Sequence, residues 1–386
     1  MAGTQFQGMW DAGKGLPIQR WTVRFSMTLI RIILFVISII MKTNIFYKIA
    51  LSAIICIPIL SCVQSRKDSG IPIVIFDTDL GNDIDDVLAL QMLFNYAHEG
   101  LIDLRGVTIS KCNPHSIEVV DGLCRYNGFE DMPLGYAYNG VTPEDNSYLL
   151  PTLAATFEGR RLLNPKRTLS PGIPEGYKAL RKWLSEAADT SVVLIAVGPL
   201  TNIGRLIDSQ GDEISPLSGV ELMKKKVKLF EIMGGEYSRQ YNDFAEYNIT
   251  SDLAAAKSVI EKSPVGIIAS GWEVGSAVRY PHESILQDFG DPLADPLCVA
   301  YMHYQPMPYD RECWDLTAVL DAVEGDNELF GRSVRGRIIV NEKGITRFVE
   351  CENGKDAFLI LDSAKIDQVV STLVKRVVGK ASDDES

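Results

Sequence analysis

The chain has 386 residues, of which 46% are hydrophobic and 23% are charged, and its formal net charge is −12. This apolar fraction is ample for a packed core and excludes intrinsic disorder as a global description. The excess of 50 acidic over 38 basic residues argues against a nucleic-acid-binding surface, because phosphates would be repelled over most of it. Where the excess carboxylates lie is then the main question, because a cluster of them would require a cation.

Residues 41–62 have the pattern of an export signal. Two lysines follow Met41, the stretch 49–60 is apolar, and Ser61 and Cys62 end it. A basic start, an apolar core and a small residue before the cut are typical of a secretory signal. The letters ILSC at 59–62 also resemble a bacterial lipobox, which predicts that Cys62 is the lipidated first residue of the mature protein. A plain cleaved signal and an uncleaved membrane anchor are the alternatives.

The remaining boundaries follow from this signal. Met41 is a better start than Met1, so residues 1–40 are interpreted as an upstream extension that is not translated if synthesis begins at Met41. Residues 63–70 form a polar tether, and 71–380 are predicted to be a single domain. We expect the protein to be an exported, membrane-anchored lipoprotein that faces the periplasm or the cell surface.

From residue 71 onward, apolar runs of strand length alternate with stretches of helical spacing. In chain order we expect a strand at 71–76, a helix at 87–97, a strand at 104–110, helices at 116–126 and 177–187, a strand at 191–197, a helix at 200–207, a strand at 227–233, a helix at 252–262, a strand at 265–270 and a hairpin at 337–348. Continuous apolar strands separated by helices predict an α/β fold, with a mostly parallel open sheet covered by helices on both faces.

Each predicted strand is followed by a polar or glycine-rich turn. In open α/β sheets, ligands bind beyond the carboxyl ends of the strands, so these turns predict a site at that edge. The first turn contains five carboxylates within ten residues and no basic residue: Asp77, Asp79, Asp83, Asp85 and Asp86. Such a loop requires protonation or a bound cation, and carboxylate oxygens suit calcium or magnesium. The alternative is a solvated acidic turn that caps the next helix.

Four segments in order resemble the inosine–uridine-preferring nucleoside hydrolase superfamily. They are DTDLGNDIDDVLAL at 77–90, VGPLTN at 197–202, MGG at 233–235 with AEYN at 245–248, and WDLTAV at 314–319. The resemblance extends from residue 71 to about residue 325. It implies the family's fold and its activity, which is calcium-dependent hydrolysis of the N-glycosidic bond of ribonucleosides to free base and ribose.

The resemblance also implies roles for individual residues around the ion. Asp79, Asp86 and Asp315 match the carboxylate ligands of calcium, and the backbone carbonyl of Val197 matches the main-chain ligand. Asp79 further matches the residue that takes a proton from the metal-bound water, which is the nucleophile. Asp295, in the segment ADPLCV, is similar in appearance to the late ligand. It lies too close to residues 271–273 for the family's spacing, which Asp315 fits.

The substrate contacts follow from the same resemblance. Met233 begins the segment that resembles the family's ribose-binding segment, and in it Glu246 and Asn248 match residues that hold the ribose hydroxyls. Asn113 matches an asparagine that lines the pocket. The first motif departs from the family pattern, because it has one extra residue and a leucine in place of proline. The aspartate that binds the ribose diol is therefore either Asp83 or Asp85; the position adjacent to a ligand favours Asp85.

Trp314 is the second departure. The inosine–uridine-preferring enzymes have a histidine at this position, which protonates the leaving base, whereas a tryptophan resembles the purine-preferring group, in which an aromatic side chain stacks on the base. We therefore expect purine nucleosides to be favoured, as in purine salvage, and plain core packing is the alternative role. Tyr138, Tyr148 and Trp272 are candidates for a second stacking partner.

Two other functions remain open at this stage. A non-catalytic nucleoside- or sugar-binding lipoprotein could keep the metal site, as the missing histidine suggests. A phosphatase of the haloacid-dehalogenase type would use Asp77 as its nucleophile, but that reading leaves the acidic run from Asp83 to Asp86 without a role. The expected partners are a small nucleoside and, through the lipid anchor at Cys62, the membrane. The resemblance also leaves a homo-oligomer open, because the family often forms dimers or tetramers.

Overall fold

Eight strands form one sheet in the computed structural model, which describes residues 70–141, 148–169, 172–238, 243–325 and 328–379. The strand order is β11 (Gly331–Arg332), β14 (Ala357–Ile360), β8 (Ile267–Ser270), β7 (Val227–Met233), β6 (Val192–Ala196), β1 (Ile73–Thr78), β2 (Asp103–Lys111) and β3 (Leu134–Val141). Neighbouring strands are parallel except β11 and β14, which are antiparallel. The chain leaves β1 toward β2 on one side and later adds β6 on the other, which makes the gap between β1 and β6 the switch point of the sheet.

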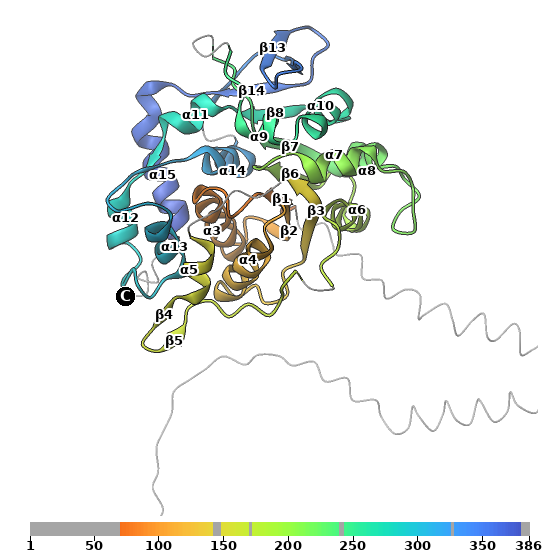
Figure 1. The fold of residues 1–386 in the computed structure, drawn as a ribbon. Helices are drawn as coiled ribbons and strands as arrows, with labels where there is room; N and C mark the ends of the chain where they lie inside the picture. The colour runs from red at the N-terminus through yellow and green to blue at the C-terminus, as the bar shows by residue number, and fades with distance from the viewer. Residues whose placement is uncertain (1–69, 142–147, 170–171, 239–242, 326–327, 380–386) are drawn as a thin grey trace, which may run out of the picture. The chain divides into compact units, whose positions relative to one another are not determined.

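Helices cover both faces of this sheet (Figure 1). One face carries α3 (Asp85–His98), α4 (Pro114–Tyr126), α5 (Leu149–Ala154), α11 (Trp272–Ala277), α12 (His282–Gln287), α13 (Pro296–Tyr304), α14 (Trp314–Glu324) and α15 (Ile366–Val378). The other face carries α6 (Gly176–Glu186), α7 (Thr201–Asp208), α8 (Gly219–Lys226), α9 (Tyr247–Ser251) and α10 (Leu253–Lys262). The fold class predicted from the alternation is confirmed.

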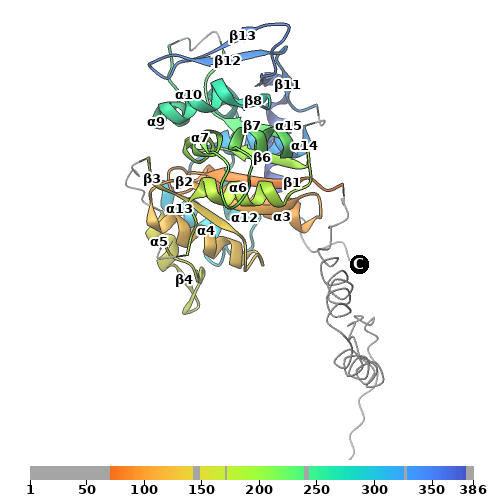
Figure 2. The same ribbon diagram turned by 90° about the vertical axis from the view of Figure 1, so that its right-hand side faces the viewer.

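The short remaining elements lie outside the main sheet. They are the two-stranded sheets β4 (Thr156–Phe157) with β5 (Arg160–Arg161), β9 (Arg279–Tyr280) with β10 (Arg311–Glu312), and β12 (Gly336–Val340) with β13 (Thr346–Glu350), and the 3-10 helix at Ser363–Lys365. Figure 2 places the hairpin β12–β13 beside α9 and α10. This hairpin is the one predicted at 337–348.

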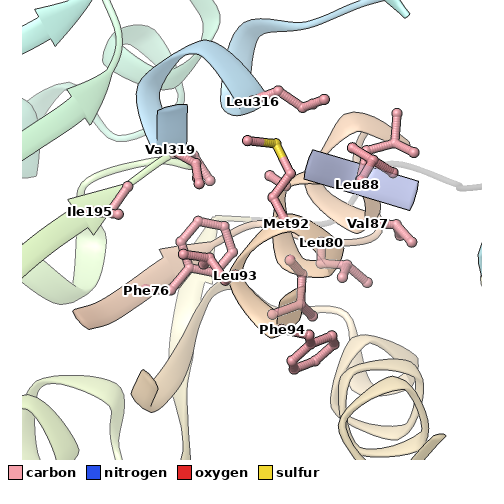
Figure 3. Packing of buried hydrophobic residues seen from close by; sticks show 14 of the residues in the cluster. Phe76, Leu80, Val87, Leu88, Met92, Leu93, Phe94, Ile195, Leu316 and Val319 are labelled. Atoms are coloured by element: carbon pink, nitrogen blue, oxygen red, sulfur yellow. The ribbon is translucent and has the colours of Figure 1, made fainter. Parts of the chain in front are cut away.

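Two apolar clusters, one on each face, form the core. Side chains of a strand alternate between faces, and in β1 Phe76 belongs to one cluster while Ile75 belongs to the other. On the first face, α3 packs its apolar side against the sheet and against α14, which also lies on the sheet, and Figure 3 shows Met92 and Leu93 pointing toward Leu316 and Val319. This packing brings the start of α14 next to the start of α3, although more than 200 residues separate them.

The predicted strands agree with the structure to within two residues at their ends. The strands β3, β11 and β14 of the main sheet were not predicted; β3 has no continuous apolar run in its sequence LGYAYNGV, and β11 and β14 are only two and four residues long. The predicted upstream extension, signal peptide and tether lie outside the described residues, except for Gly70. Within the described residues, no helix is long and apolar enough to cross a membrane.

Candidate active site

The loop between β1 and α3 carries carboxylates to the carboxyl edge of the sheet. Leu80 and Ile84 are fully buried and anchor the loop. Gly81 has φ +111°, a conformation that strains any side chain. The hydroxyl of Tyr148 accepts a hydrogen bond from the Gly81 N–H and donates one to the Asp83 carbonyl, both at 2.8 Å. Tyr148 therefore links the glycine of the turn to the residue before the buried Ile84.

Four carboxylates, which we call the acidic cluster, converge beside this loop: Asp79, Asp85, Asp86 and Asp315. Asp85 and Asp86 begin α3, and Asp315 lies in the first turn of α14. Asp85, Asp86 and Asp315 each offer an oxygen, and these oxygens all lie within 4.8 Å of one another. The backbone N–H of Asp315 donates to Asp85 at 3.1 Å. Two helix N-termini meet here, and their positive dipole ends favour negative charge.

Burial strongly disfavours the charged form of these carboxylates. It raises the pKa of Asp79 to about 7, against the lowering effect of the nearby Lys111. Burial, with further repulsion from neighbouring carboxylates, raises the pKa values of the other three members of the cluster well above their usual range. Among the described residues that line the surrounding cavity, Arg311 is the only cationic side chain, so a bound cation would stabilise the ionised cluster.

The donor set of the acidic cluster fits a hard divalent cation. All of its ligand atoms are oxygens, which suit calcium or magnesium. The buried Oδ2 of Asp79 finds no hydrogen-bond partner among the described residues, and an unpartnered buried carboxylate oxygen is costly. The cluster can therefore hold a metal ion.

A second polar segment joins the ends of β6 and β7 next to the cluster. The Glu246 carboxylate caps α9 by accepting hydrogen bonds from backbone N–H groups, including that of Asn248 at 2.8 Å. Asn248 in turn donates to the carbonyls of Val197 at 2.7 Å and Met233 at 3.2 Å. Burial raises the pKa of Glu246 to about 7. Both side chains are thus fixed by the backbone before any ligand binds.

One cavity of about 180 Å³ brings these groups together. Its lining residues are Asp79, Asn82, Asp83, Asp85, Asp86, Val197, Met233, Glu246, Tyr247, Asn248, Trp272, Arg311, Trp314 and Asp315. The cavity lies beyond the carboxyl ends of β1, β6 and β7, which is where an open α/β sheet binds its ligands.

Residues 74–363 match the family model described as inosine-uridine preferring nucleoside hydrolase. The chain belongs to this nucleoside hydrolase family. Its members are hydrolases that act on nucleosides, and the acidic cluster is the place where a metal ion could bind in this member. No curated protein matches the chain.

Solved structures share the fold at low sequence identity. A plant nucleoside hydrolase, PpNRh1, is 19% identical, with a TM-score of 0.58 over 80% of this chain and 99% of its own. A purine-preferring ribonucleoside hydrolase from Gardnerella vaginalis is 16% identical, with a TM-score of 0.59 over 80% and 100%. An inosine-uridine preferring enzyme from Bacillus anthracis is 17% identical, with a TM-score of 0.53 over 79% and 100%.

Nearly all the site residues predicted for this nucleoside hydrolase line the one cavity; Asn113 does not. The Asn113 side chain accepts a hydrogen bond from the His115 N–H at 3.0 Å and caps α4. None of the four histidines of the sequence, which all lie in the described ranges, lines the cavity. Asp295 caps α13 and lies outside the cavity.

The two candidates for the ribose diol have different surroundings. Asp85 is buried in the acidic cluster. Asp83 instead forms a forked ion pair with Arg311, with Nε to Oδ1 at 2.8 Å and Nη2 to Oδ2. Asp85 thus stays next to the predicted ligands, while Asp83 has a protein partner of its own.

Tyr247, Trp272 and Trp314 are the aromatic residues that line the cavity, and we call the two tryptophans the aromatic wall. The Trp314 indole N–H lies 3.1 Å from the Trp272 carbonyl and 3.0 Å from the Ser276 hydroxyl, so both acceptors hold the ring in place. Of the other proposed stacking partners, Tyr148 is buried under the acidic loop and Tyr138 donates to the Ile173 carbonyl; neither lines the cavity.

Sequence reasoning missed two basic residues near the site. Arg311 lies three positions before Trp314, and only its proximity to that motif could have drawn attention to it. Lys111, at the end of β2, is 2% exposed and donates to Asn82 at 3.0 Å and to the Tyr247 hydroxyl at 2.8 Å. A lysine directly after an apolar strand was the available signal.

The structure argues against the phosphatase alternative. Asp77 is fully buried, accepts hydrogen bonds from Thr108 and Asn202, and does not line the cavity. A nucleophile must reach its substrate, and this carboxylate joins β1, β2 and α7 instead.

Proposed function

We propose that the chain is a calcium-dependent nucleoside N-ribohydrolase that favours purine nucleosides and releases free base and ribose. The observation that carries the proposal is the shared cavity, in which a buried acidic cluster, a sugar-facing polar segment and an aromatic wall meet. Family membership supports the reaction class.

Calcium is the cation proposed for the acidic cluster. Asp79, Asp86 and Asp315 would hold it, with the carbonyl of Val197 as the main-chain ligand. Several carboxylates and a carbonyl suit the larger coordination number of calcium better than the strict octahedron of magnesium. When bound, the ion would lower the pKa of a coordinated water and so supply a nucleophile near neutral pH.

The chain's own residues would prepare the substrate and move the proton. Asp79, whose second oxygen has no partner among the described residues, would accept the proton of the attacking water. Glu246, Asn248 and Asp85 would bind the ribose hydroxyls and fix the anomeric carbon. The surrounding carboxylates would stabilise the positive charge of an oxocarbenium-like transition state.

The purine preference rests on the aromatic wall. Trp272 and Trp314 offer large π-surfaces within the cavity, and a purine has a larger ring face than a pyrimidine. The absence of a histidine among the described lining residues favours this group over the enzymes that protonate the base with histidine.

The test is release of free ribose by residues 71–386 from inosine, guanosine, adenosine and uridine. We expect turnover of the purine nucleosides with calcium and none after dialysis against a chelator. Magnesium should restore less activity than calcium. Asp79→Asn, with Asp295→Asn as a matched control away from the cavity, should abolish turnover. No ribose from any nucleoside in the presence of calcium would overturn the proposal.

The second candidate, a nucleoside-binding protein without turnover, is favoured by the lack of a lining histidine. Calorimetry on the same material separates the two functions, because tight binding without ribose release supports only the second.

We also propose that the protein is an exported lipoprotein anchored through Cys62, which supports a role in salvage of external purine nucleosides. Expression of the full chain with labelled fatty acid should label it and place it in the membrane fraction. Cys62→Ser should remove the label. Soluble, unlabelled protein from both genes would contradict this assignment.

A further inference from the structure

Arg311 lines the cavity beside the acidic cluster. It lies in β10, just before α14, and its side chain is 14% exposed. Among the described residues that line the cavity it is the only cationic side chain. Its guanidinium carbon lies 5.0 Å from the centre of the Trp314 ring and 5.1 Å from that of Tyr304. The guanidinium therefore covers part of the aromatic wall on which a base would rest.

The position of this guanidinium is set by two carboxylates. Asp83 binds it as a fork, and Glu312 accepts from Nη1 at 3.1 Å. Arginine has five N–H donors, and these contacts use three of them. Two N–H groups remain for a ligand, on a side chain that its partners hold in one orientation.

The loop of the first motif supplies the partner of Arg311. Asp83 lines the cavity, while Ile84 is buried and Asp85 stays with the acidic cluster. The loop thus provides, besides the cluster, a carboxylate that anchors Arg311. The two features lie far apart in the sequence and meet only in the fold.

We propose that Arg311 is a catalytic residue that stabilises the leaving base, and that Asp83 is its positioning residue. This inference rests on the proposed nucleoside hydrolysis. When the C1′–N9 bond breaks, both electrons go to the base, water oxygen bonds to C1′, and the water proton passes to Asp79. Arg311 offsets the charge that develops on the base by hydrogen bonding to its acceptor edge, and a solvent proton then neutralises the departed base. No lining histidine is required.

This role selects a class of substrate. Guanine and hypoxanthine present two acceptors, O6 and N7, to which arginine donates in a bidentate fashion, whereas adenine presents an amino donor in place of O6. Arg311 therefore favours nucleosides of 6-oxopurines, such as inosine and guanosine, over adenosine.

The experiment compares Arg311→Gln with wild type on inosine, adenosine and p-nitrophenyl ribofuranoside. The nitrophenolate leaves without help, so its release reports the rest of the active site. Removal of a donor that acts at developing charge costs about 100-fold or more. We expect about this loss in kcat/KM for inosine, a smaller loss for adenosine and little change for the nitrophenyl substrate.

Three further variants complete the test. Arg311→Lys keeps the charge without the fork and should recover part of the lost activity on inosine. Asp83→Asn should lower the inosine-to-nitrophenyl ratio in the same direction but less. Arg279→Gln is the matched control, because Arg279 also pairs with Glu312 but lies outside the cavity; it should leave the ratio unchanged. Thermal melting of each variant checks that it folds, and Arg311→Lys replaces Arg311→Gln if the latter does not.

The outcomes separate the inference from the function it rests on. An equal loss on inosine and the nitrophenyl substrate, or no loss on either, would overturn the role of Arg311 while leaving nucleoside hydrolysis intact. A wild-type protein that cleaves none of the three substrates would instead overturn the proposed function itself.

Discussion

The acidic cluster and the loop around Asp212 place carboxylates in opposite electrostatic surroundings. Asp212 receives two hydrogen bonds from the Arg181 guanidinium, at 2.8 and 3.0 Å, and this partner lowers its pKa to about 2. Burial raises the pKa of Asp79 to about 7, even though Lys111 lowers it. Asp212 has an arginine of the protein as its counter-charge, whereas the acidic cluster around Asp79 can accept a cation from solution. The comparison indicates which carboxylates serve the fold and which serve a ligand.

Removal of the cation should have the largest effect. A chelator, or Asp86→Asn, should lower nucleoside turnover by about 1000-fold or more, because the water loses its activating ion. Ribose release with and without added calcium measures this, and titration calorimetry should show weaker calcium binding in the variant. Full activity in a chelator would contradict the view that the acidic cluster, unlike the Arg181–Asp212 pair, needs a cation from outside the protein.

The pH dependence of stability should differ with and without calcium. The folded-state pKa of Asp79 exceeds its value of 3.8 in the unfolded chain. Its contribution to stability is therefore fully present below about pH 4 and is lost as the pH rises through about 7. In a chelator, the free energy of unfolding should fall between pH 5.5 and pH 8 by about 2 kcal/mol from Asp79 alone, since the folded state releases its proton over about 1.5 pH units of this interval and one unit corresponds to about 1.4 kcal/mol.

Calcium should remove this slope, because it stabilises the ionised cluster. Urea unfolding at the two pH values, with calcium and with chelator, measures both effects. Asp79→Asn should reduce the slope in the chelator. A wild-type slope of the opposite sign between pH 5.5 and pH 8 would contradict the burial argument.

Arg181→Met should remove the ion pair with Asp212 and destabilise the protein. Arg181 is fully buried and also donates to the Ser209 hydroxyl and to the carbonyls of Ser215 and Leu217. The substitution leaves these buried acceptors unsatisfied, which should destabilise the protein by about 1–3 kcal/mol. Calcium affinity should stay unchanged, because the pair lies outside the cavity.

The control for this variant is Lys178→Met. Lys178 faces Glu213 across 4.0 Å at the surface, and exposed pairs contribute less than about 1 kcal/mol. Equal destabilisation by the two variants, measured by urea unfolding, would show that the buried arginine has no special role.

Asp295→Ala should have the smallest effect. Asp295 resembles Asp315 in sequence, but it caps α13 through the N–H groups of Leu297 and Cys298. Loss of such a cap costs about 1 kcal/mol. Nucleoside turnover and calcium affinity should not change, in contrast to Asp315→Asn, and a parallel loss in both variants would mean that Asp295 belongs to the site.

Local patterns predicted much of the fold and of the candidate site. Buried parallel strands such as β6 are continuous apolar runs, and these stand out without any knowledge of their neighbours. The edge strand β3 lacks such a run and was missed. The ordered motifs indicated the family, and they named the carboxylates that line the cavity because strand ends in a parallel sheet share one edge.

The sequence by itself determined the alternation of strands and helices, the acidic loop and the family, since each depends on residues close together in the chain. Only the tertiary structure decided that Asp83 pairs with Arg311 and that Asn113 caps a helix outside the cavity. It also decided that Lys111 donates hydrogen bonds to Asn82 and Tyr247, two residues that line the cavity. The Asp83 and Lys111 contacts join distant segments, and packing of α3 against α14 brings Asp83 and Arg311 together. The Asn113 cap is a local contact with His115, and only its distance from the cavity depends on the fold. The excess of negative charge noted at the outset thus belongs in part to the candidate site, because folding gathers four aspartates beside a cavity whose described lining has one cationic side chain.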